Sequence, residues 1–350
     1  MAECTEKDLK KQIAADNLSG LYLLYGEEKY LVSLWAQRLI KKAAGKAFLD
    51  FNLQHFTGEV SADALDDAVQ ALPFMAARKC VAVSDLSLDG RTPAENKKLL
   101  QLLGDVPETT VLVLSFAASD PDFRKDKKWK AIFAASKEHG TCTAFGRRTK
   151  SELEKTLMTG AAKRGCSLAR ADAAQMVYAV GDNLTALQNE LEKVCAYTGS
   201  GAVSPKTLQL LITQNLETRI YDLSKALLAG NSGRSYRILD QLLEQKEEPV
   251  HILAVLSGAY IDMYRVRTAL QSGESAMEPA AHFPEYKRRE FRLSNAERDT
   301  HGLSTQILRS SLDTLLQADL DLKGSRTDEK LILEKTLARL LLIARGEKSA

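Results

Sequence analysis

In the first 145 residues, short apolar runs alternate with segments whose apolar residues recur at helical spacing. Five runs predict strands, most of them continuously apolar, as in a parallel sheet covered on both faces: residues 21–25, 51–56, 80–85, 110–116 and 141–145. Between them, apolar residues at i, i+3, i+4 and i+7 predict helices over residues 30–44, 61–71, 93–103 and 127–138. Ser61 and Thr92 are the expected N-caps of two of these helices. The β-α-β-α order predicts an α/β domain with a parallel sheet over residues 1–145.

Beyond residue 145 the strand pattern ends and helical patterns take over. Short helices that would form a small domain over residues 146–214 are predicted at residues 151–164, 171–180 and 184–197. Ser151 and Glu154 have the spacing of a capping box at the start of the first. Longer helices, forming an all-α domain over residues 215–350, are predicted at residues 221–229, 232–245, 249–270, 284–293, 304–323 and 328–345. Residues 271–284 are the expected loop.

Composition narrows the class of protein. With 350 residues, 45% hydrophobic and 27% charged, the chain has the balance of a soluble globular protein. The net charge of +2 does not indicate a nucleic-acid or membrane partner through bulk electrostatics, so any contact with DNA must be local. No run approaches the roughly 18 apolar residues of a membrane span, and the charged N-terminus does not resemble a signal peptide. We therefore expect a cytoplasmic protein with no membrane partner.

The cysteines and histidines do not predict a metal or catalytic site. Five cysteines stand far apart, without a Cys-x-x-Cys pair or a histidine at ligand spacing: Cys4, Cys80, Cys142, Cys166 and Cys195. The histidines lie in unrelated contexts: His55, His139, His251, His282 and His301. We expect no zinc site, no disulfide framework, no catalytic residues and no cofactor, and we expect Cys80 and Cys195 to be buried.

Residues 21–34 have the strand–turn–helix order of a phosphate-binding loop, with Gly26 at the start of the turn. The pattern G-x-x-x-x-G-K-[ST], counted from Gly26, places Leu31 at the second glycine and Val32 at the lysine, so that only Ser33 matches. The loop therefore lacks both the cation for the phosphates and the glycine that lets the backbone approach them.

Acidic residues point the same way. Glu27 and Glu28 put negative charge where phosphate would sit. The predicted strand at 80–84 ends in Asp85, but Leu86 follows instead of the second acid expected where magnesium is held and water is polarised. ATP hydrolysis is therefore not expected, and Asp85 is more simply a surface or capping residue.

These segments resemble the delta family of bacterial clamp loaders, members of the AAA+ superfamily in which the nucleotide-binding fold persists without its catalytic parts. LYLLYGEEKYL resembles the family's hydrophobic-Gly-x-Glu-x-x-Leu signature. FRKDKKWKAI, GDNLTALQNELEKV and LLQADLDLKGSRTDEKLILEKTL resemble its basic segment after the fourth strand, its lid helix and its C-terminal collar helices. The resemblance implies an AAA+ (RecA-like) α/β domain, a small helical lid domain and an all-α collar that mediates oligomerisation.

The resemblance also implies a function and partners. Members of the family bind the sliding clamp (the beta subunit) and open it for loading onto primed DNA, without hydrolysing ATP themselves. ATP would act in the tau/gamma subunits, which with delta-prime complete the loader within the DNA polymerase III holoenzyme. The nucleotidyltransferase activity would belong to this chain by association.

The segment ALPFMAARKCV resembles the family's clamp-binding element, which inserts an apolar pair into a pocket of the clamp. Phe74 and Met75 match the pair, Leu72 and Pro73 precede it, and Arg78 matches the basic residue after two small ones. Met75 departs from the second aromatic of many relatives, although a thioether fills a pocket well. Periodicity leaves open that Phe74 packs inside its own domain.

Two basic clusters are candidate contacts to DNA phosphates: Arg124, Lys125, Lys127 and Lys128, and Lys287, Arg288 and Arg289. Solvated helical faces are the simpler interpretation, because acids lie between the basic residues and no aromatic stacking platform accompanies them.

Three other functions stay open. An active AAA+ ATPase or helicase loader is disfavoured by Leu31, Val32 and Leu86. A delta-prime subunit would carry a cysteine-rich zinc module and a Ser-Arg-Cys motif, and the sequence has neither. The third is a scaffold unrelated to replication.

Overall fold

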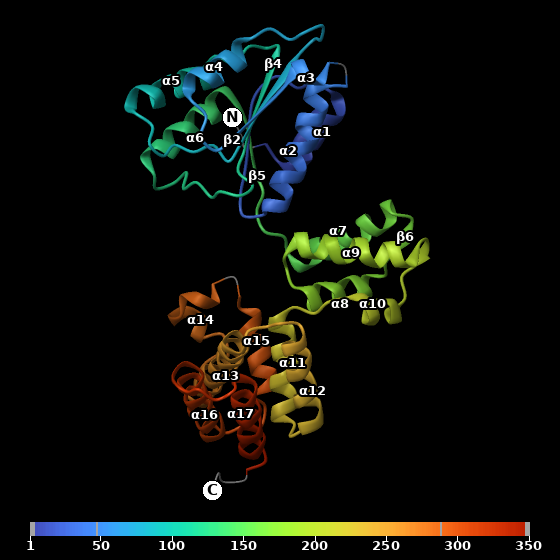
Figure 1. The fold of residues 1–350 in the computed structure, drawn as a ribbon, viewed down its shortest axis with the longest axis vertical. Helices are drawn as coiled ribbons and strands as arrows, with labels where there is room; N and C mark the ends of the chain where they lie inside the picture. Colours follow the sequence, from blue (N-terminus) through green and yellow to red (C-terminus); the bar gives the residue numbers. More distant parts are fainter. Residues whose placement is uncertain (1–3, 47, 288, 347–350) are drawn as a thin grey trace. The chain divides into compact units, whose positions relative to one another are not determined.

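The computed structural model of the chain describes residues 4–46, 48–287 and 289–346. The chain divides into two compact units, Met1–Leu153 and Glu154–Ala350. The first is coloured blue to green and the second green to red in Figure 1. This division falls close to the predicted end of the α/β domain at residue 145. The further domain boundary at residue 214 stays a prediction.

The first unit is built on a five-stranded parallel sheet with the strand order β2-β3-β4-β1-β5. Its strands are β1 (Gly20–Tyr25), β2 (Leu53–Thr57), β3 (Lys79–Ser84), β4 (Thr110–Ser115) and β5 (Gly140–Ala144). Strand β4 is buried along its whole length, and β1 and β3 along nearly all of theirs. Burial on both faces explains why these strands read as continuous apolar runs. The predicted α/β fold class is confirmed.

Helices cover both faces of the sheet. They are α1 (Glu6–Ala15), α2 (Lys29–Ala44), α3 (Leu49–Asn52), α4 (Ala62–Gln70), α5 (Pro93–Gly104) and α6 (Lys127–His139). Helices α1 and α2 lie on one side, and α4, α5 and α6 on the other (Figure 1). Ser61 and Thr92 cap α4 and α5 as predicted. Helix α1 was not predicted, and the predicted strand at 51–56 is wrong at its start, because Phe51 belongs to α3.

The second unit begins with four short helices: α7 (Lys150–Lys163, which starts in the first unit), α8 (Arg170–Val180), α9 (Leu184–Thr198) and α10 (Pro205–Leu211). Two-residue strands, β6 (Cys166–Ser167) and β7 (Gly201–Ala202), pair in parallel. The capping box predicted from Ser151 to Glu154 is wrong. The chain enters the helix two residues earlier, where Thr149 and Glu152 exchange the two capping hydrogen bonds. Glu154 instead accepts from Arg170 at 3.0 Å.

The rest of the second unit is a helical assembly around one apolar core. Its elements are α11 (Leu216–Leu228), α12 (Ser232–Glu244), α13 (Pro249–Gln271), α14 (Pro279–His282), the 3₁₀ turn η1 (Pro284–Tyr286), α15 (Phe291–Asp299), α16 (Thr305–Gly324) and α17 (Glu329–Ala344). The helix predicted at 284–293 is wrong, because the 3₁₀ turn ends at Tyr286 and the next helix, α15, starts only at Phe291. The buried Tyr286 hydroxyl donates to the buried Asp262 at 2.7 Å. Helix α14 lies inside the segment predicted as a loop. Within the described ranges, no helix is both long and apolar enough to cross a membrane.

Candidate functional site

The loops after β1, β3, β4 and β5 meet at the carboxyl edge of the sheet, where α/β folds commonly bind nucleotides. Gly26, directly after β1, has φ +135° and packs against the end of β5. A Cβ at this position would lie 2.3 Å from the carbonyl oxygen of Phe145. The backbone amide of Glu28 donates to that same oxygen at 3.0 Å. The Glu28 amide in this turn therefore binds the protein's own backbone rather than a ligand.

The residues that replace the glycine and lysine of a phosphate loop belong to the core. Leu31 and Val32 lie in the first turns of α2 and are 5% and 0% exposed. Ser33 is half-buried. The positions that would approach and neutralise phosphate thus pack α2 onto the sheet.

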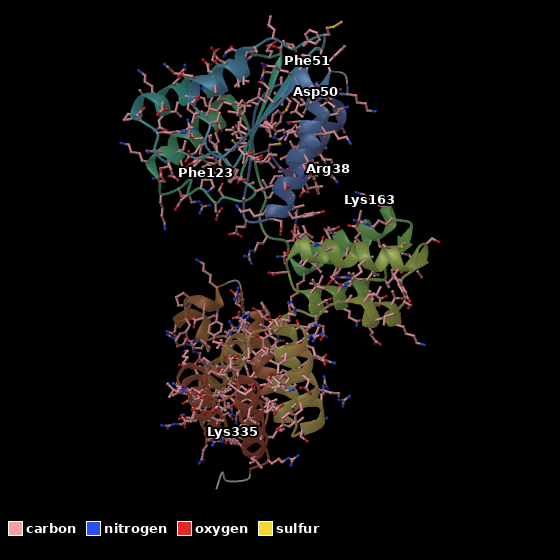
Figure 2. The ribbon with its side chains drawn as sticks, in the orientation of Figure 1. Arg38, Asp50, Phe51, Phe123, Lys163 and Lys335 are labelled. Atoms are coloured by element: carbon pink, nitrogen blue, oxygen red, sulfur yellow. The ribbon has the colours of Figure 1, made fainter. Side chains whose placement is uncertain are left out.

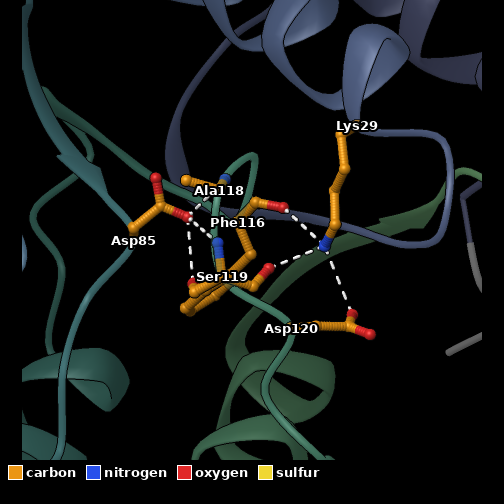
Figure 3. Close-up of polar contacts among 6 residues, drawn as sticks. All are labelled: Lys29, Asp85, Phe116, Ala118, Ser119 and Asp120. Carbon is orange, nitrogen blue, oxygen red and sulfur yellow. Dashed lines mark hydrogen bonds and ion pairs between the residues drawn. The ribbon is translucent and has the colours of Figure 1, made fainter. Parts of the chain in front are cut away.

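A lysine outside the phosphate-loop pattern spans this edge of the sheet (Figure 3). The ammonium group of Lys29 donates to the carbonyl oxygens of Phe116 and Ser119 at 3.3 and 2.6 Å, and lies 3.2 Å from a carboxylate oxygen of Asp120. An ammonium has three donors, so these contacts account for all of them. Lys29 therefore connects the start of α2 to the loop after β4.

Asp85 holds the same loop from the other side (Figure 3). Its Oδ1 accepts from the backbone amides of Ala118 and Ser119, both at 2.8 Å, and from the Ser119 hydroxyl at 2.9 Å. The neighbouring Leu86 is 2% exposed. These contacts confirm Asp85 as a capping residue of the protein's own backbone.

An exposed apolar turn follows α4. Leu72, Phe74 and Met75 are 84%, 45% and 74% exposed, while Pro73 is half-buried. Met75 has φ +47°, in the left-handed region that bulky residues rarely adopt. We call residues 72–75 the apolar tip. Phe74 is not among the buried residues of the unit's core, and its role in binding the clamp stays a prediction.

Helix α3 contributes residues that the sequence analysis did not assign to the site. The Phe74 ring contacts Phe48 and Phe51, with ring centroids 5.5 and 4.9 Å apart, and both partners are themselves exposed. Figure 2 shows Phe51 and Asp50 on this helix. The buried Asn52 side chain binds the Phe74 backbone. Phe48 lies just before α3 in a left-handed conformation, so the helical spacing rule could not have linked it to Phe51.

Arg78 lies at the base of the tip and is engaged inside the unit. Its guanidinium donates to the carbonyl oxygens of Asp16 and Ala43 at 3.0 and 3.2 Å, and it forms an ion pair with the Asp16 carboxylate. These contacts connect the turn to the ends of α1 and α2. Its assignment as a clamp contact stays a prediction.

The basic candidates belong to different units. Exposed on the loop before α6 and on its first turn are Arg124, Lys125, Lys127 and Lys128. Lys287 and Arg289, in the second unit, are also exposed, and Arg288 lies outside the described residues. Near the first cluster, Phe123 and Trp129 turn inward and pack on the buried Phe116, with centroids 5.7 and 5.3 Å from it. Both rings therefore pack on the core and do not form an exposed platform on which a base could stack.

All five cysteines are unpaired thiols, and four of them are buried. Burial raises the pKa of the Cys80 thiol to about 12, so it stays protonated at neutral pH. Among the residues that the structure describes, no group of three or more His, Cys, Asp or Glu side chains could hold a metal ion.

Comparison with known proteins is consistent along the chain. A family model described as DNA polymerase III, delta subunit, matches residues 22–140, and one for the C-terminal domain of that subunit matches residues 217–340. DNA polymerase III subunit delta of Bacillus subtilis is 24% identical over 98% of both chains. The Escherichia coli subunit is 23% identical over 88% of this chain and 87% of its own. A solved structure of the Bacillus subtilis DNA clamp loader delta protein matches with a TM-score of 0.63, 24% identity and coverage of 96% of this chain and 99% of its own.

Proposed function

We propose that this chain, which belongs to the DNA polymerase III delta subunit family and is a clamp-loader subunit, grips the sliding clamp with its apolar tip and favours the open ring. The proposal rests on one observation above all: a large apolar pair, Phe74 and Met75, stands exposed on a turn. Exposed apolar residues gathered at one place commonly mark protein interaction sites.

The tip can supply a useful part of the binding free energy. Fully burying a Phe or Met side chain contributes about 1.5–3 kcal/mol, but Phe74 is 45% exposed and Met75 74% exposed before binding. Scaled to these fractions, the pair contributes about 2–3.5 kcal/mol, or roughly 30- to 300-fold in affinity. If the pocket fits the tip better in the open ring, the same energy shifts the ring toward opening.

Opening the clamp in this way requires no ATP hydrolysis by this chain. At the carboxyl edge of the sheet, which we call the nucleotide edge, the charged residues Lys29 and Asp85 bind the chain's own loop after β4. The apolar Leu31 and Val32 stand where a phosphate loop has its second glycine and its lysine. We assign hydrolysis to the tau/gamma partners, which with delta-prime would position the tip. Micromolar ATP binding by the purified chain would instead favour an active ATPase.

Contact with primed DNA is a second part of the proposal. The exposed Arg124, Lys125, Lys127 and Lys128 would lie against phosphates inside the assembled loader, and Lys287 and Arg289 would do so from the second unit. The proposal places the protein in the bacterial cytoplasm, with the chromosome.

The test is the double variant Phe74→Ala with Met75→Ala, titrated calorimetrically against the purified clamp. We expect affinity to fall at least about 30-fold, while the unfolding midpoint stays close to that of the unaltered chain, because both side chains are largely outside the core. Leu210→Ala is the matched control, since Leu210 is 69% exposed in the second unit and should leave affinity unchanged. Undiminished affinity of the double variant would contradict the proposal.

A further inference from the structure

Asn52 is a buried polar residue whose amide faces the apolar tip. It is 1% exposed. Its Nδ2 donates to the carbonyl oxygen of Phe74 at 2.8 Å, and its Oδ1 accepts from the backbone amide of Phe74 at 2.7 Å. The side chain thus satisfies both backbone groups of the tip's aromatic residue. A buried amide is costly unless paired, so this pairing specifies one position for the turn.

The backbone on either side of this pairing is strained. Phe48 has φ +53° and Met75 φ +47°, a conformation that large side chains avoid. Such residues persist where the surrounding structure over-determines them, and they cluster at functional sites. Here both strained residues carry exposed apolar side chains that border Phe74.

The aromatic side chains of Phe51 in α3, of Phe48 just before α3 and of Phe74 in the tip form one surface. The Phe51 ring lies 4.9 Å from the Phe74 ring at 34°, and the Phe48 ring 5.5 Å away at 86°. Phe51 is 64% exposed and Phe48 46% exposed. Rings in direct contact leave no room for water between them, so a pocket that receives Phe74 also meets the ring beside it.

We infer that the clamp-binding surface is composite: Phe51 of α3 and Phe48, the residue before α3, complete it, and Asn52 is the positioning residue that fixes Phe74 within it. The inference rests on the proposed function, and its occupant is the same apolar pocket of the clamp. Phe51 has the larger role of the two aromatic residues, because it has more surface to bury and stacks closer to Phe74.

The first measurement titrates full-length Phe51→Ala against the purified clamp. We expect at least about a tenfold loss of affinity with an unchanged unfolding midpoint, because the ring is mostly exposed. Tyr197→Ala is the matched control, since Tyr197 is 63% exposed in the second unit, and it should bind like the unaltered chain. Unchanged affinity of Phe51→Ala would overturn the inference. If Phe74→Ala with Met75→Ala still loses binding, the proposed function stands; if neither variant changes affinity, it falls as well.

The second measurement tests Asn52 with a double-mutant cycle. Asn52→Asp keeps the acceptor for the Phe74 amide but turns a carboxylate toward its carbonyl oxygen. We expect Asn52→Asp to weaken clamp binding about tenfold in the unaltered background and less than twofold in a Phe74→Ala background, because Asn52 acts through Phe74. Equal losses in both backgrounds would mean a general structural role and would overturn the positioning assignment. Loss of self-association by Phe51→Ala in sedimentation, with clamp binding intact, would assign the surface to a second copy of the chain.

Discussion

Replacing Met75 by glycine should stabilise the protein while weakening its grip on the clamp. Met75 holds φ +47°, where an L-residue suffers steric repulsion between its Cβ and the backbone and glycine does not. The side chain is 74% exposed, so its removal takes little apolar area out of the folded unit. The change therefore acts mainly on the backbone.

The magnitude follows from two opposing effects. Relief of the left-handed conformation is worth about 1–2 kcal/mol, and the greater flexibility of glycine in the unfolded chain costs about 0.5–1 kcal/mol. The net gain is about 0.5–1 kcal/mol. Met75→Ala is the matched control, because alanine removes the thioether but keeps the Cβ and the strain.

Chemical unfolding of the three proteins, followed by circular dichroism, measures the difference, and titration against the clamp gives the second reading. We expect the variant with glycine at position 75 to be more stable than the alanine variant by about 0.5–1 kcal/mol, and both variants to lose affinity to a similar extent. If the glycine variant is no more stable than the alanine variant, the turn is not strained in the way the backbone angle implies.

Two further variants test other parts of the first unit. Gly26→Ala should lower the free energy of unfolding by about 3 kcal/mol, because its Cβ would lie 2.3 Å from the Phe145 carbonyl oxygen. Gly58 has φ +66° and no heavy atom within 4 Å of an added Cβ, so the control Gly58→Ala should cost only about 1 kcal/mol. Equal losses in the two variants would contradict the packing of the turn. The hydrogen bond from Arg78 lowers the pKa of Asp16, so its contribution to stability is complete above about pH 4 and is lost as the pH falls through the lowered folded-state value. Asp16→Asn should therefore flatten the fall in urea midpoint below about pH 4, and an unchanged acid slope would count against this pair.

The sheet could be predicted from sequence because burial on both faces leaves a local trace. Strand β4 reads as Thr-Val-Leu-Val-Leu-Ser and is buried throughout, so composition and position agree. Failures arose where a local pattern had two solutions. Phe51 lies in a run that was predicted as a strand, but it belongs to α3. Near residue 150, Thr149 and Ser151 both precede an acid by three residues, and the chain uses the first.

The candidate site was only half predictable, because its missing half depends on contacts between distant parts of the chain. Residues 72–75 follow a helix and stop its apolar pattern, so an exposed turn could be expected there. Asn52 reaches Phe74 across 22 positions, and no periodicity records that pairing. Lys29 and Ser119, 90 positions apart, show the same limit at the nucleotide edge.

The contrast between these two regions argues for where function lies in the first unit. At the nucleotide edge, charged groups that could face a ligand face the protein, since Lys29 has three acceptors and Asp85 three donors. Asp85 itself has φ +52°, a conformation that aspartate adopts more readily than bulky residues do. At the tip, large apolar side chains face solvent and the Met75 backbone is strained, and both features oppose stability. Proteins keep such local conflicts chiefly where a function needs them, so the tip, and not the nucleotide edge, is where a partner should bind.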